Sequence, residues 1–210
     1  MNPIFYFLLA LTAVLASTAN AGGPVLDVNG NFIFSGSYYV LPVIFGAAGG
    51  GLTLAPRGDK PCPLYVVQDT LEVNKGIPVR FLNWRSRVGF VPESENLNIE
   101  MDVKATVCAQ SAYWWVVPSD RDTRTWVIAA GRKPEAEEKS SRSFFQIKKS
   151  GGFPNGYNIV FCPSGNDCMN VGVSVDENGV RRLALSSRPF PVVFAKATKP
   201  KTPSKTMSII

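Results

Sequence analysis

The sequence predicts an all-β fold, because its apolar residues fall in short runs that lack helical spacing. About a dozen runs of β-branched and aromatic residues follow one another, and Gly, Pro, Asn or Asp separates them. No stretch holds apolar residues at positions i, i+3, i+4 and i+7 over three turns. So many short strands in roughly 175 residues predict a closed or nearly closed body, a barrel or a sandwich.

Each run is long enough for one strand. In chain order the expected strands cover residues 37–45, 51–56, 64–68, 77–83, 88–92, 97–102, 113–119, 125–131, 143–150, 157–162, 171–176, 181–187 and 190–196. LNIEMD and RRLALS alternate apolar and polar residues, which is typical of half-buried antiparallel strands. Asn178-Gly179 lies between two runs and predicts a hairpin turn that needs positive φ. No close repeat is readable, although three strand-rich thirds can be marked off.

Both ends of the chain differ from this pattern. Residues 1–21 hold a long apolar run and end in Ala-Asn-Ala, which predicts a secretory signal peptide cut before Gly22. Its apolar core of about 14 residues is shorter than the ~20 that a membrane-spanning helix needs, so no anchor is expected. We expect one domain over residues 22–198. Residues 199–210 hold two prolines among lysines and threonines and are expected to form a basic, disordered tail.

The four cysteines indicate two disulfides. Their number is even, and the signal peptide directs them to an oxidising compartment. Four cysteines can pair in three ways, and we favour sequential pairing of Cys62 with Cys108 and of Cys162 with Cys168. On the chain-entropy model the first link adds about 4 kcal/mol of stability and the second about 2 kcal/mol.

Charge and composition exclude several classes of function. The net charge is +6, but four lysines from Lys196 onward leave the folded body near +2, which argues against nucleic-acid or membrane binding. The chain has no histidine, which excludes a Ser-His-Asp or Cys-His nucleophile and any His-ligated metal. No glycine-rich phosphate loop followed by a helix is present. We therefore expect neither an enzyme nor a cofactor.

Two groups of large side chains have structural interpretations. Trp114, Trp115 and Trp126 are expected to pack in the core or at its rim, because no repeated Gln-x-Trp pattern of sugar-binding trefoils occurs. Arg181 and Arg182 follow the predicted hairpin turn, and we expect them at the exposed start of a strand.

The mature N-terminus, VLDVNGNFIFSGSYYVL at residues 25–41, has fixed points at Val25, Asp27, Asn29, Gly30, Asn31, Ile33 and Tyr39. It resembles the signature opening of the Kunitz-type soybean trypsin inhibitor family. The likeness continues through CPLYVVQ, NLNIEMD, YNIVFCP, VGVSVDENGVRRLALS and FPVVFAK, in family order along nearly the whole mature chain. The resemblance implies a β-trefoil with sequentially paired cysteines. It also implies a monomeric plant protein, secreted or vacuolar, that inhibits a trypsin-like serine protease.

Family inhibitors insert an exposed loop into the protease cleft, and the resemblance brackets that loop within residues 83–92. Alignment backward from NLNIEMD puts the specificity position on Arg87, with Val88 after the scissile bond. Alignment forward from Cys62 lands on Ser86, because this chain has one extra residue. An arginine can pair with the carboxylate at the base of a trypsin-like pocket, which favours Arg87, with Arg85 as the fallback.

Three further residues bear on how firmly the loop is held. Trp84 is expected to anchor it by packing. Ser35 stands where the family has a loop-supporting asparagine, and a serine offers one donor instead of two. Gly89 follows Val88 and loosens the backbone. The alternatives are a storage or stress protein of the same fold with an inactive loop, and a trefoil that binds a sugar or pigment.

Overall fold

The computed structural model describes residues 22–44, 46, 48–86, 88–104, 106–108, 111–119, 125–135, 141–164 and 167–198. The predicted signal peptide (1–21) and tail (199–210) lie outside the described residues. The strands are β1 (Tyr38–Pro42), β2 (Leu52–Arg57), β3 (Lys60–Gln68), β4 (Val79–Leu82), β5 (Asn98–Met101), β6 (Tyr113–Pro118), β7 (Trp126–Gly131), β8 (Phe145–Lys149), β9 (Tyr157–Phe161), β10 (Met169–Val175), β11 (Arg181–Ser186) and β12 (Val192–Lys196). One 3-10 turn, Ser141–Ser143, precedes β8.

Six strands close into a ring. Antiparallel ladders join β1 to β4, β4 to β5, β8 to β9, β9 to β12 and β12 back to β1. The remaining join, between β5 and β8, is made by Leu97 and Phe145, whose backbones exchange hydrogen bonds of 2.9 and 3.0 Å. The ring therefore has no free edge along its circumference.

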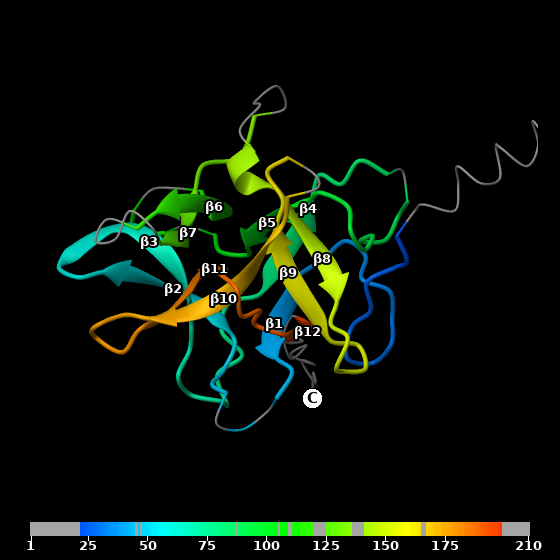
Figure 1. The fold of residues 1–210 in the computed structure, drawn as a ribbon, viewed down its shortest axis with the longest axis horizontal. Coiled ribbons are helices and arrows are strands. Elements are labelled where there is room, and N and C mark those ends of the chain that lie inside the picture. Colours follow the sequence, from blue (N-terminus) through cyan, green and yellow to red (C-terminus); the bar gives the residue numbers. More distant parts are fainter. Residues whose placement is uncertain are drawn as a thin grey trace, which may run out of the picture.

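The other six strands form three hairpins, β2–β3, β6–β7 and β10–β11, which cover one end of the ring. Each hairpin pairs with the other two, through β3 with β7, β7 with β11 and β11 with β3. In Figure 1 the hairpins lie to the left of the ring strands. A six-stranded barrel capped by three mutually paired hairpins is a β-trefoil, so the predicted fold class is confirmed.

Large aromatic side chains fill the barrel. Phe194 contacts Phe81 edge-on, with ring centroids 5.2 Å apart, and Tyr157 at 5.6 Å. Phe145 contacts Trp114 in the same edge-on manner at 5.7 Å. These rings contribute hydrophobic burial and the quadrupole contacts that aromatic pairs prefer. In the described part of the chain, no helix is long and apolar enough to cross a membrane.

Most expected strands are present, and one is not. Residues 88–92 form no strand, and their backbone bonds go to the N-terminal segment instead. The Asn178-Gly179 turn joins β10 and β11 as predicted, and Gly179 adopts a φ of 76°. The connection between the two strands runs from Asp176 to Val180. Asp176 Oδ1 holds it together by accepting hydrogen bonds from the backbone N–H groups of Asn178 and Val180.

Trp114 lies in the core as expected. Trp115 is half-buried and Trp126 is exposed, and each lies beside an arginine, Arg132 and Arg142 respectively. The prediction for the arginine pair is wrong. Arg182 is 3% exposed, because Tyr65 and Asp176 enclose its guanidinium. Arg181 is half-buried and donates to Gln68 Oε1 at 2.9 Å.

The disulfides join Cys62 to Cys108 and Cys162 to Cys168, with Cα atoms 5.6 and 4.3 Å apart. Sequential pairing is confirmed. The first link closes a separation of 46 residues that contains β4, β5 and their connection. The second joins the end of β9 to the segment before β10.

Candidate reactive loop

The candidate reactive loop is the connection from Asn83 to Leu97, between β4 and β5. Its base is closed by the pairing of Leu82 with Asn98. Just beyond this pair, Asn83 adopts a φ of 60°, a left-handed conformation that asparagine tolerates better than most residues. The loop therefore leaves the barrel through a sharp bend.

An asparagine pair holds this bend. Asn83 Nδ2 donates to Asn98 Oδ1 at 2.9 Å, and Asn98 is only 3% exposed. Asn98 Nδ2 donates in turn to the Ser143 carbonyl at 2.8 Å and to its hydroxyl at 3.2 Å. Because buried hydrogen-bonded amides have few alternative conformations, the base of the loop is tied to the 3-10 turn before β8.

The returning part of the loop, residues 91–94, is hydrogen-bonded along its backbone to the N-terminal segment and to β8. Val91 N–H donates to the Ile33 carbonyl at 2.8 Å, and Val25 N–H donates to the Val91 carbonyl at 2.9 Å. Glu93 N–H donates to the Gly23 carbonyl at 2.8 Å, and Ser94 N–H donates to the Ile147 carbonyl at 2.9 Å. This pairing explains why the apolar run at 88–92 forms no ladder strand.

The tip of the loop has two internal hydrogen bonds. Trp84 packs against the core, and its indole Nε1 donates to the Val88 carbonyl at 3.0 Å. The Ser86 backbone N–H donates to the carboxylate of Glu95 across the loop. Arg87 itself lies outside the described residues. Its neighbours on both sides, Ser86 and Val88, are each held by a side chain of the same loop.

Arg85, the fallback specificity residue, is exposed. It lines a surface pocket of about 670 Å³ together with Ser86 and Glu95. The hydroxyl of Ser86 is buried and has no hydrogen-bond partner among the residues that the structure describes. Arg85 therefore lies beside the Ser86–Glu95 contact.

Ser35 is exposed, and it lines a different pocket, of about 460 Å³, next to Trp84 and Asn83. The space between Ser35 and the loop is therefore open. Gly89 is also exposed, and a Cβ atom added there would meet no atom within 4 Å. The conformation at Gly89 does not require glycine, because its φ is not positive.

Two contributors to loop support, Glu95 and Asn98, were not predicted. Their side chains act across the loop, on residues 9 and 15 positions away. The sequence signal that points to them is the polar run ESEN directly before the apolar alternation of β5. Cys62 lies near the start of β3, in a cap hairpin and not in the loop. The disulfide from Cys62 to Cys108 therefore brackets the loop in the sequence.

Comparisons with known proteins agree with this geometry. A family model described as trypsin and protease inhibitor, of the Kunitz legume type, matches residues 25–196. Kunitz trypsin inhibitor 4 of Arabidopsis thaliana is 57% identical over 213 residues, covering 99% of this chain and 97% of the relative. The alpha-amylase/subtilisin inhibitor of Oryza sativa subsp. japonica is 38% identical over 205 residues, covering 93% and 95%.

Solved structures show the same relationship. Soybean trypsin inhibitor in complex with porcine pancreatic trypsin superposes with a TM-score of 0.69 at 31% identity, covering 84% of this chain and 100% of the inhibitor. A Kunitz type trypsin inhibitor from Cicer arietinum gives a TM-score of 0.71 at 37% identity, covering 83% and 99%. Fold, disulfides and sequence therefore agree along the domain, and the chain belongs to the Kunitz legume family of trypsin and protease inhibitors, which are not enzymes.

Proposed function

We propose that this protein inhibits a trypsin-like serine protease through the 83–97 loop, with Arg87 as the specificity residue and Val88 after the scissile bond. The observation that carries the proposal is the restraint on both sides of Arg87, where Glu95 holds Ser86 and Trp84 holds Val88. Membership of an inhibitor family supports it.

The mechanism follows from the cost of ordering a peptide. A flexible peptide with arginine at the cut site is a substrate, because it loses conformational entropy on binding and its fragments diffuse away. A loop already held in the bound shape avoids most of that cost. If its cut ends stay in place, the acyl step can reverse and the complex dissociates slowly. The contacts at both ends of the loop serve this purpose.

The arginine side chain favours a trypsin-like target. A guanidinium can form two parallel hydrogen bonds with a carboxylate at the base of the protease pocket. The relatives differ in the targets that their names carry, since the Arabidopsis protein is called a trypsin inhibitor and the rice protein an alpha-amylase/subtilisin inhibitor. Trypsin is therefore the first target to test, and subtilisin and α-amylase are the comparison targets.

Titration of bovine trypsin with the mature protein tests the proposal. We expect stoichiometric inhibition that Arg87→Ala abolishes and that Arg85→Ala leaves nearly unchanged. Both variants remove one arginine from the same loop, so Arg85→Ala controls for charge and folding. The absence of inhibition of trypsin and chymotrypsin at micromolar protein would favour a storage or stress protein with an inactive loop.

We further propose that the mature protein is a monomer of the secretory pathway, secreted or vacuolar. The two disulfides support this assignment, because such links persist in oxidising compartments. Fractionation of the source tissue with an antibody against residues 22–198 checks the compartment, and recovery in the cytosol would contradict it.

A further inference from the structure

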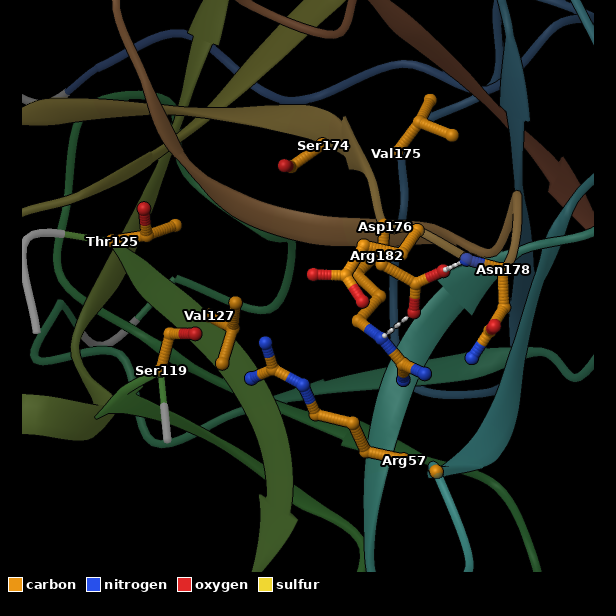
Figure 2. Close-up of a pocket in the computed structure, with 11 residues that line it drawn as sticks. Arg57, Ser119, Thr125, Val127, Ser174, Val175, Asp176, Asn178 and Arg182 are labelled. Atoms are coloured by element: carbon orange, nitrogen blue, oxygen red, sulfur yellow. Dashed lines mark hydrogen bonds and ion pairs between the residues drawn. The ribbon is translucent and has the colours of Figure 1, made fainter. Parts of the chain in front are cut away.

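The three cap hairpins line a pocket at the position where they meet. Its volume is about 210 Å³, and its lining comes from β2, β7, β10, β11 and the ends of their turns. Figure 2 shows Arg57 and Arg182 entering it from β2 and β11, with Ser119 and Thr125 from the β6–β7 hairpin. The reactive loop does not contribute to this pocket. The volume is below the ~300 Å³ of common small-molecule pockets, so it suits a single chemical group.

Arg182 is held rigidly at this pocket. Its Nε donates to Asp176 Oδ2 at 2.8 Å, its Nη2 donates to the Pro56 carbonyl at 3.0 Å, and its guanidinium stacks on Tyr65 at 5.4 Å. The side chain is 4% exposed, yet its Nη1 has no hydrogen-bond partner among the described residues. A buried charged donor without a partner is costly, so a ligand that accepts this bond gains free energy.

The carboxylate of Asp176 is already engaged. It accepts from the backbone of Asn178 and Val180 and from Arg182, and the dashed lines in Figure 2 mark two of these contacts. Burial alone would raise the pKa of Asp176, but the Val180 hydrogen bond, Arg182 and the Asn178 hydrogen bond together lower it. Asp176 therefore balances the charge of Arg182, whereas the second arginine of the pocket forms no ion pair with any residue that the structure describes.

Arg57 is that second arginine. It ends β2 and is half-buried, and its Nη1 is buried without a hydrogen-bond partner in the part of the chain that the structure describes. Ser119, which also lines the pocket, is 4% exposed and supplies a hydroxyl. Glu177 also lines the pocket, and its side chain is exposed. Two unpartnered guanidinium nitrogens and a hydroxyl therefore line a small space.

We propose that this pocket binds a tetrahedral oxyanion, phosphate or sulfate, either as the free ion or as an ester group on a larger ligand. Nη1 of Arg57 and Nη1 of Arg182 donate to it, and the Ser119 hydroxyl donates to a third oxygen. A tetrahedral dianion has enough oxygens for both guanidinium groups and matches their forked geometry. A water molecule would accept the same bonds but carries no negative charge to pair with the two guanidinium groups.

Calorimetry and thermal unfolding of the mature, disulfide-bonded protein test the site. Sodium phosphate and sodium sulfate at low millimolar concentration are compared with sodium chloride and acetate at equal ionic strength. We expect saturable binding and a rise in Tm with phosphate or sulfate only. Arg57→Gln should weaken the affinity at least tenfold, and Arg57→Lys, which keeps the charge without the fork, by a smaller factor.

Arg188→Gln is the matched control, because it removes one exposed positive charge elsewhere on the surface and should leave the affinity unchanged. Sulfate and phosphate also stabilise proteins by exclusion from the surface. An equal rise in Tm with phosphate or sulfate for the wild type and Arg57→Gln would therefore overturn the proposal, as would the absence of saturable binding. A comparison of a sulfated monosaccharide with free sulfate and the unsulfated sugar shows whether the pocket binds the free ion or an ester group on a larger ligand. Tighter binding of the ester indicates a larger ligand, and equal binding indicates the free ion.

The site is independent of protease inhibition. Arg57→Gln should titrate trypsin with the same stoichiometry and inhibition constant as the wild type. The oxyanion proposal and the inhibitory function can therefore fail separately.

Discussion

The indole Nε1 of Trp84 donates a hydrogen bond of 3.0 Å to the carbonyl oxygen of Val88, and these two residues lie on either side of Arg87 in the chain. Because Trp84 also packs against the core, the bond links the residue after the proposed cut site to the barrel. A loop held in this way has less conformational freedom to lose when a protease binds it.

Removal of this hydrogen bond should weaken inhibition. Trp84→Phe keeps most of the packing surface but removes the donor, which costs about 0.5–1.5 kcal/mol, or roughly a two- to tenfold rise in the inhibition constant for trypsin. Trp115→Phe is the control, because Trp115 Nε1 donates to the Arg132 carbonyl in a cap hairpin. Equal inhibition constants for the two variants would show that the Trp84 bond does not hold the loop.

Stiffening of the backbone after the cut site should improve inhibition. Gly89→Ala introduces no clash and no positive-φ strain, because the added Cβ has no neighbour within 4 Å. Alanine has fewer accessible backbone conformations than glycine, so the conformational entropy that the loop loses on ordering falls by about 0.4–1 kcal/mol in free energy. The inhibition constant should therefore fall roughly two- to fivefold, and cleavage of the loop during long incubation should slow. A Gly151→Ala variant, also without close neighbours, controls for general stabilisation.

A longer side chain at position 35 should support the loop. Ser35 lines an open pocket of about 460 Å³ beside Trp84 and Asn83, so an asparagine has room there. One additional hydrogen bond to the loop lowers the inhibition constant of Ser35→Asn by roughly two- to tenfold. Ser35→Ala should leave it nearly unchanged. A lower inhibition constant for Ser35→Ala, or a higher one for Ser35→Asn, would contradict a supporting role for this position.

The Asp176–Arg182 ion pair should make stability depend on pH in the acid range. The pKa of Asp176 is lowered in the folded protein, so its contribution is fully present above the unfolded value of about 3.9 and is lost as pH falls through the folded value. The difference in Tm between the wild type and Asp176→Asn should be large at pH 6 and should shrink below about pH 4. Asp59→Asn, an exposed carboxylate of the β2–β3 turn, controls for lost charge. A pH-independent difference would contradict the ion pair.

Much of the fold could be predicted because strand formation depends on local patterns. The patterns in residues 97–102 and 181–187 and the Asn178-Gly179 turn act over a few residues, and the strands and the turn that they predict are present in the structure. The run at 88–92 was misjudged because its partner is the N-terminal segment around Ile33, and a local pattern contains no information about that distant partner.

The polar contacts of the site and of the cap were harder to predict. Charge suggested that Arg182 is exposed, but Pro56 and Tyr65, more than 100 residues earlier, form its buried surroundings. Glu95 and Asn98 were missed for a related reason, since their contacts depend on the bend at Asn83. The family resemblance predicts the position of the reactive loop, and only the geometry identifies the side chains that form hydrogen bonds within and beside that segment.

Mapping the bond that trypsin cuts in the complex tests the central claim most directly. The mature protein is incubated with trypsin until equilibrium, the complex is isolated, and mass spectrometry identifies new chain ends after denaturation. We predict a single cut between Arg87 and Val88, coexisting with intact chain, while trypsin stays inhibited. A cut after Arg85, or cleavage at Arg87 accompanied by the return of full trypsin activity, would contradict a loop that is held in place.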